Sequence, residues 1–82
     1  MNEVEIYAEL TSVFHEAFDD DTITISPKTT AEDIKGWDSV KMVAIIIATE
    51  SKFKIKMRSR DVDRLQNVGD LVEIIKAYKK QP

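Results

Sequence analysis

The stretch that decides the fold is Gly36-Trp37-Asp38-Ser39-Val40, which is followed by an apolar run from Met42 to Ala48. Gly36 permits a tight turn, and helical periodicity begins at Ser39. Asp38 is a favourable N-cap, because its carboxylate can accept hydrogen bonds from the free N–H groups of the first helical turn. We therefore expect the Ser39 hydroxyl at a loop–helix junction, at the positive end of the helix dipole and within reach of another protein.

These residues resemble the Asp-Ser-Leu signature of acyl carrier proteins and related peptidyl carriers. The resemblance covers nearly the whole chain, from the helix before the loop through the segment Phe53-Lys54-Ile55-Lys56-Met57 to a final amphipathic helix. It implies that Ser39 carries phosphopantetheine, which comes from coenzyme A, is attached through a phosphodiester and holds an acyl or aminoacyl cargo as a thioester. It also implies that Asp38 faces the phosphopantetheinyl transferase that adds this group.

Length and composition fit one small globular domain spanning residues 1–82, with 43% hydrophobic and 33% charged residues. The chain has no cysteine, so it has no disulfide and no thiolate of its own. The longest apolar run is too short to cross a bilayer, and the acidic N-terminus argues against a signal peptide. We expect a free-standing cytoplasmic monomer with no membrane partner.

The net charge of −3 is divided unevenly along the chain. Residues 1–38 contain ten acidic and two basic side chains, whereas residues 39–82 contain five acidic and ten basic ones. A basic segment of this kind could bind nucleic acid. Asp61 and Asp63 interrupt it, however, and no exposed aromatic side chain accompanies it, so we expect a solvated face and no nucleic-acid partner.

A first helix is predicted over residues 2–18, and a long packed loop over residues 22–37. His15 lies beside the apolar face of this helix and is expected to be a surface or boundary residue rather than a catalytic base. Residues 19–21 are predicted to form a solvated turn, because the spacing of the three carboxylates is not that of a calcium loop, and no metal is expected. The apolar face of the first helix consists of Val4, Tyr7, Leu10, Phe14 and Ala17, and it is widened by Ile6, Val13 and Phe18. The loop is expected to pack through Ile23, Ile25, Ile34 and Trp37, with Trp37 as an anchor in the core.

The second helix, predicted over residues 39–52, has two apolar faces. At about 100° per residue these faces lie roughly 150° apart. Only one can be the main core face of so small a protein, and we assign the core to the bulkier face. That face consists of Met42, Ile45, Ile46, Thr49 and Phe53. The other face should stay partly accessible beside Ser39, with Val43 nearer the interior than Val40, Ala44 and Ile47.

Residues 52–58 alternate apolar and basic side chains, and we predict an extended connector whose apolar side chains plug the helix ends. A short helix follows over residues 59–65 with Ser59 as its cap, and Asn67 caps the last helix. The apolar face of the last helix consists of Val68, Leu71, Ile74, Ile75 and Tyr78. The predicted fold is all-α, a small four-helix bundle of three long helices and one short helix with a long loop between helices 1 and 2. The resemblance implies an up-down arrangement.

The expected function is carriage rather than catalysis. The residues around Ser39 do not form a Gly-x-Ser-x-Gly elbow, and one histidine with no visible orienting partner gives little support for a catalytic triad. The expected partners are a phosphopantetheinyl transferase and acyl-loading and acyl-transferring enzymes of a fatty-acid, polyketide or other specialised pathway. These partners are expected to dock on Val40, Lys41, Ala44 and Ile47. The alternative is a helical protein-interaction domain that uses the same apolar patch and never takes a prosthetic group.

One departure from the family pattern bears on the choice of pathway. Lys41 and Ala44 stand where acidic residues are frequent in the family, and Glu50 is the only acidic residue left in this helix. Enzymes of the common fatty-acid pathway are therefore expected to bind weakly, and a specialised carrier fits the sequence better.

Overall fold

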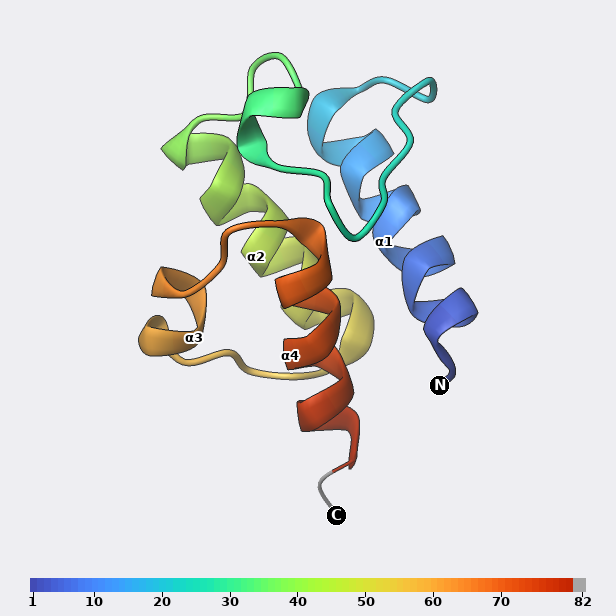
Figure 1. Cartoon of the computed structure of the whole chain (residues 1–82), viewed down its shortest axis with the longest axis vertical. Coiled ribbons are helices and arrows are strands. Elements are labelled where there is room, and N and C mark those ends of the chain that lie inside the picture. The colour runs from blue at the N-terminus through green and yellow to red at the C-terminus, as the bar shows by residue number, and fades with distance from the viewer. Residues whose placement is uncertain (81–82) are drawn as a thin grey trace.

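The computed structural model describes residues 1–80, which form four α-helices and no strand. The long helices are α1 (Glu3–Phe18), α2 (Ser39–Phe53) and α4 (Val68–Lys80), and the short helix is α3 (Ser59–Asp63). A 3-10 turn, η1 (Ala31–Asp33), lies in the long loop between α1 and α2. Figure 1 shows this loop running from the end of α1 towards the start of α4 and then to the start of α2. The predicted all-α fold is confirmed.

The core is formed by α1, α2, α4 and the connector that follows α2. On α1 the buried side chains include Leu10, which is fully buried, whereas Val4 is 78% exposed. Val4 points roughly 120° away from Leu10 around the helix axis, so the prediction that it joins the core face is wrong, and Ile6 is the first buried residue of α1. The core comprises Ile6, Leu10, Val13, Phe14, Ile45, Phe53, Met57, Val68, Leu71, Val72 and Ile75.

The second helix buries one of its two apolar faces. Ile45, Thr49 and Phe53 are buried, and Met42 and Ile46 are half-buried, so the predicted core face of α2 is confirmed.

The connector after α2 is extended and pairs with no strand among residues 1–80, as predicted. Met57 is buried and Ile55 is half-buried, while the lysines between and before them are exposed. The only carboxylate of α2 fixes this segment, because Glu50 Oε2 accepts a hydrogen bond from the backbone N–H of Met57 at 2.8 Å. The only acidic side chain of α2 is therefore engaged in a hydrogen bond within the protein.

Ser59 does not cap α3, which corrects the prediction. It is the first helical residue, and Arg58 occupies the N-cap position. The reason is Asp61, whose Oδ2 accepts hydrogen bonds from the backbone N–H of Arg58 at 3.3 Å and from the hydroxyl of Tyr78 at 2.6 Å. The bond from Tyr78 lowers the pKa of the Asp61 carboxyl. Asn67 does cap α4, because its Oδ1 accepts a backbone N–H of the first turn at 2.8 Å.

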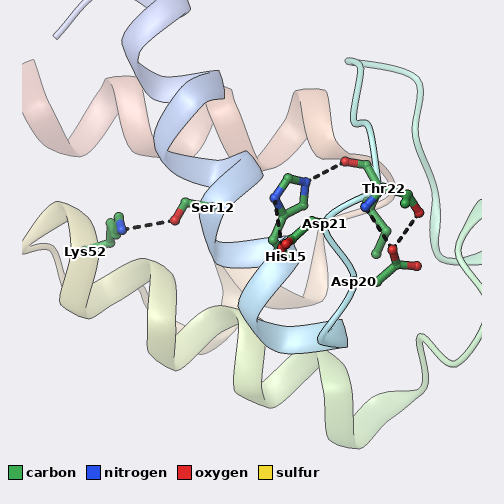
Figure 2. Close-up of polar contacts among 7 residues, drawn as sticks. Ser12, His15, Asp20, Asp21, Thr22 and Lys52 are labelled. Atoms are coloured by element: carbon green, nitrogen blue, oxygen red, sulfur yellow. Dashed lines mark hydrogen bonds and ion pairs between the residues drawn. The ribbon is translucent and has the colours of Figure 1, made fainter.

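Hydrogen bonds to neighbouring helices hold the long loop in place. His15 Nε2 donates to the carbonyl of Ile23 at 2.8 Å, which ties the start of the loop to α1 (Figure 2). Further along, the carbonyl of Thr29 accepts a hydrogen bond from the N–H of Val68 at 2.9 Å. The first N–H groups of a helix have no partner within it, so the loop completes the N-terminus of α4.

We predict that Gly69→Ala destabilises the protein, although alanine is the better helix former by about 1 kcal/mol. The N–H of Gly69 donates to the carbonyl of Pro27 at 2.9 Å, and a Cβ on Gly69 would also lie 2.9 Å from that oxygen. Because the obstacle is backbone, we expect the free energy of unfolding in urea to fall by about 1–3 kcal/mol.

The exposed variant Ala77→Gly in the same helix is the control for helix propensity and should lose about 1 kcal/mol. A Gly69→Ala protein more stable than the wild type would contradict the predicted clash between the loop and α4.

Candidate functional site

The start of α2 has the geometry predicted for the loop–helix junction. Asp38 is the N-cap, and its Oδ1 accepts a hydrogen bond from the N–H of Lys41 at 2.9 Å. Gly36 turns the chain into this cap with a φ of +89°, a conformation that side-chain-bearing residues rarely adopt. Ser39 is the first residue of the helix and is exposed. No side-chain hydrogen bond among residues 1–80 uses its hydroxyl, so the oxygen is free to react.

Trp37 anchors the end of the loop, as predicted. Its ring is half-buried and packs edge-on against Phe14, with ring centroids 5.2 Å apart, and against Phe18, with centroids 6.3 Å apart. Both phenylalanines belong to α1. The residue two positions before Ser39 is therefore fixed to the neighbouring helix.

The free N–H groups of α2 suit a phosphodiester on Ser39. Of the first amides in the helix, that of Lys41 bonds to the Asp38 side chain and that of Met42 bonds to the Asp38 carbonyl at 2.9 Å. The amides of Ser39 and Val40 have no acceptor among residues 1–80. A helix N-terminus with free amides favours an anion. The residues present therefore fit an anionic prosthetic group attached through the serine oxygen.

A row of apolar side chains lies exposed on α2 next to Ser39. The exposed fractions are 74% for Val40, 57% for Val43 and 61% for Ile47, and Ala44 is exposed with them. The prediction that this face stays accessible is confirmed. Val43 is slightly less exposed than Val40 and Ile47, which agrees in direction with its expected place nearer the interior, although it is still a surface residue.

Lys41 makes a contact that the sequence did not indicate. The side chain is half-buried, and Nζ donates to the carbonyl of Ala17 at 2.6 Å, at the end of α1. From the sequence it is expected only as one of the residues on which partners dock. The contact joins residues that are 24 positions apart, so no local pattern could have indicated it.

A small apolar cavity of about 70 Å³ lies between the loop, α2 and the turn from α3 to α4. Trp37, Met42 and Ile45 line it from the side of the junction, and Leu65 and Leu71 line it from the opposite side. From the sequence, Trp37, Met42, Ile45 and Leu71 are expected to face the core, but the space among them is not predicted, because it depends on how the helices pack.

His15 serves the loop rather than a reaction. Its Nε2 donates to the loop carbonyl of Ile23, and its Nδ1 lies 3.9 Å from a carboxylate oxygen of Asp21. Figure 2 shows both ring nitrogens facing loop atoms. In the described part of the chain no group of three or more His, Cys, Asp or Glu side chains is arranged to hold a metal ion. None of the helices there combines the length and apolarity needed to span a membrane.

The comparisons with known proteins agree with this site. The family model of the phosphopantetheine attachment site matches residues 8–75. The chain is 32% identical over 71 residues to the acyl carrier protein of Myxococcus xanthus, covering 87% of this chain and 90% of that protein. It is 30% identical over 77 residues to the meromycolate extension acyl carrier protein of Mycolicibacterium aurum, covering 94% of this chain and 79% of that protein.

The fold is also similar to that of a solved acyl carrier protein. The solution structure of the holo acyl carrier protein from Geobacter metallireducens matches with a TM-score of 0.85 and 35% sequence identity, covering 90% of this chain and 85% of that one. Members of this family are carriers rather than catalysts, and they interact with a phosphopantetheinyl transferase and with acyl-handling enzymes. On these grounds the chain belongs to the acyl carrier protein family, with covalently attached phosphopantetheine as its prosthetic group.

Proposed function

We propose that Ser39 is the residue that carries phosphopantetheine, and that the protein presents an acyl or aminoacyl group on this arm to partner enzymes. The observation that carries the proposal is the free, exposed hydroxyl of Ser39 at the start of α2. An outside enzyme can reach such a hydroxyl without opening the fold.

The residues around Ser39 hold and orient the attached group. Asp38 fixes the first turn of α2 through its bond to the N–H of Lys41, so the serine backbone is ordered before modification. The unpartnered amides of Ser39 and Val40 favour the charge of a phosphodiester. The prosthetic group, when bound, supplies a terminal thiol that holds the cargo as a thioester.

Partner enzymes dock, in this proposal, on Val40, Ala44 and Ile47 of the exposed apolar row. Exposed apolar area of this kind usually marks a binding surface. The row begins one residue after Ser39. An enzyme bound to the row therefore has the phosphopantetheine arm of Ser39 next to its binding surface.

A specialised biosynthetic pathway fits this docking face better than the common fatty-acid pathway. Family members often present acidic residues on the corresponding helix, whereas here Glu50 is bonded to the backbone N–H of Met57. Lys41 and Ala44 supply no carboxylate either. A partner whose binding depends on acidic residues of α2 would gain little from this surface.

The first prediction of this proposal concerns the attachment residue. Incubation with coenzyme A, magnesium and a broad-specificity phosphopantetheinyl transferase should add one phosphopantetheine to the wild-type protein, seen as a single step in intact mass. Ser39→Ala should abolish the addition without unfolding the domain, because alanine is a good helix former. Ser51→Ala, an exposed serine of the same helix, should be modified like the wild type. A wild-type mass that several transferases leave unchanged would contradict the proposal.

The second prediction separates two roles of Asp38. Asp38→Ala removes the cap and should cost about 0.5–2 kcal/mol in the free energy of unfolding. Asp38→Asn keeps a good N-cap without the charge, so it should be nearly as stable as the wild type. Both variants should be modified more slowly, because the carboxylate is expected to face the transferase. If Asp38→Asn is modified at the wild-type rate, Asp38 acts only as a cap.

The third prediction concerns the docking row. Ile47→Glu should raise the KM of a working acyl-transfer assay while changing the free energy of unfolding by less than about 0.5 kcal/mol, since no buried charge is created. Ser51→Glu, an exposed site one turn further along α2, is the matched control for the added charge. If Ile47→Glu unfolds the protein, or if Ile47→Glu and Ser51→Glu raise the KM equally, Ile47 is not a docking residue.

A further inference from the structure

Ser39 lies between two residues that both reach the last turn of α1. Two positions before it, the ring of Trp37 packs edge-on against Phe18. Two positions after it, the ammonium of Lys41 donates to the carbonyl of Ala17 at 2.6 Å and lies 5.6 Å from the centre of the Phe18 ring. The junction is therefore held to α1 from both sides, through one shared aromatic ring.

The contact of Lys41 satisfies one of the carbonyls at the end of α1. The last carbonyls of a helix have no donor within it. Here the carbonyls of His15 and Glu16 accept hydrogen bonds from backbone N–H groups of the following turn, and that of Ala17 accepts from Lys41. A positive charge is favourable at this negative end of the helix dipole.

Within its own helix Lys41 is unfavourably placed. It lies in the first turn of α2, where the positive end of the dipole disfavours a cation. Its side chain is also half-buried rather than free in solvent. A residue that breaks a local preference is expected where a contact elsewhere compensates it. The bond to α1 is that contact.

We propose that Lys41 is a positioning residue for the attachment serine, and that Lys41 and Trp37 together clamp the Ser39 junction onto the last turn of α1. This inference rests on the proposed function of Ser39. Residues two apart on a helix do not face each other, so Lys41 acts by fixing the first turn of α2 rather than by touching the serine hydroxyl. Position matters here, because a displacement of about 1 Å at a reacting group can cost about 100-fold in rate.

The first arm of the test measures the clamp in the unmodified protein. Lys41→Met keeps an unbranched side chain and removes the charge and the donor, whereas Lys41→Arg keeps both. Amide hydrogen exchange should show protection factors at residues 41 and 42 that are about threefold to tenfold lower in Lys41→Met and near the wild-type values in Lys41→Arg.

Lys52→Met is the matched control for this arm. Lys52 also reaches from α2 to α1, where its Nζ lies 3.5 Å from Ser12 Oγ (Figure 2). It does so from the last turn of α2, whereas Ser39 is the first residue of this helix. Its loss should leave the protection factors at residues 41 and 42 unchanged.

The second arm measures transfer of phosphopantetheine from coenzyme A by a broad-specificity transferase. Lys41→Met should lower kcat about threefold to tenfold with KM within about twofold, and Lys41→Arg should restore kcat. Phe18→Leu removes the ring that both halves of the clamp share, so the effects of Phe18→Leu and Lys41→Met on kcat should be non-additive in the double variant.

Each outcome decides the proposal. Unchanged protection in Lys41→Met overturns the clamp, and lower protection with an unchanged kcat overturns the positioning role. A raised KM at constant kcat, or additive effects with Phe18→Leu, would make Lys41 a docking charge and also overturn it. If no transferase modifies the wild-type protein, the proposed function of Ser39 fails instead, and the exchange arm still tests the clamp.

Discussion

The packing of Trp37 against the aromatic rings of α1 is the contact on which the presentation of Ser39 depends. Phe14 is fully buried in the core, and the Trp37 ring meets it edge-on at 5.2 Å. Such aromatic pairs contribute about 0.5–1.5 kcal/mol beyond the area they bury. The contact brings the end of a long loop to the C-terminal end of α1, so that α2 begins beside a rigid element. The bonds of His15 and Val68 to the loop backbone support the same arrangement.

Local signals in the sequence were enough to predict the elements and the junction. Asp38 and Asn67 were recognised as caps because capping depends on residues only a few positions apart, and the core face of α2 followed from its periodicity. Val4 and Ser59 were misassigned for reasons that are still local. Val4 lies off the centre of the α1 core face, and Asp61, not Ser59, accepts the N–H at the start of α3.

Contacts between distant parts of the chain could not be predicted in the same way. The bond from Lys41 to Ala17 and the fit of Gly69 against Pro27 depend on how helices and loop pack, and neither leaves a pattern in the neighbouring residues. The cavity beside Trp37 is also a product of packing. These features shape the surroundings of the Asp38–Ser39 junction, whereas the junction itself follows from local signals in the sequence.

We propose Ser39 as the one point of attachment, and mass mapping of protein purified from its own cells tests this assignment without a chosen transferase. Trypsin cleaves after lysine, and cleavage at Lys35 and Lys41 releases Gly36-Trp37-Asp38-Ser39-Val40-Lys41, in which Ser39 carries the only side-chain hydroxyl. We predict that this peptide carries phosphopantetheine. Recovery of the peptide only in its unmodified form, or of the group on another peptide, would contradict it.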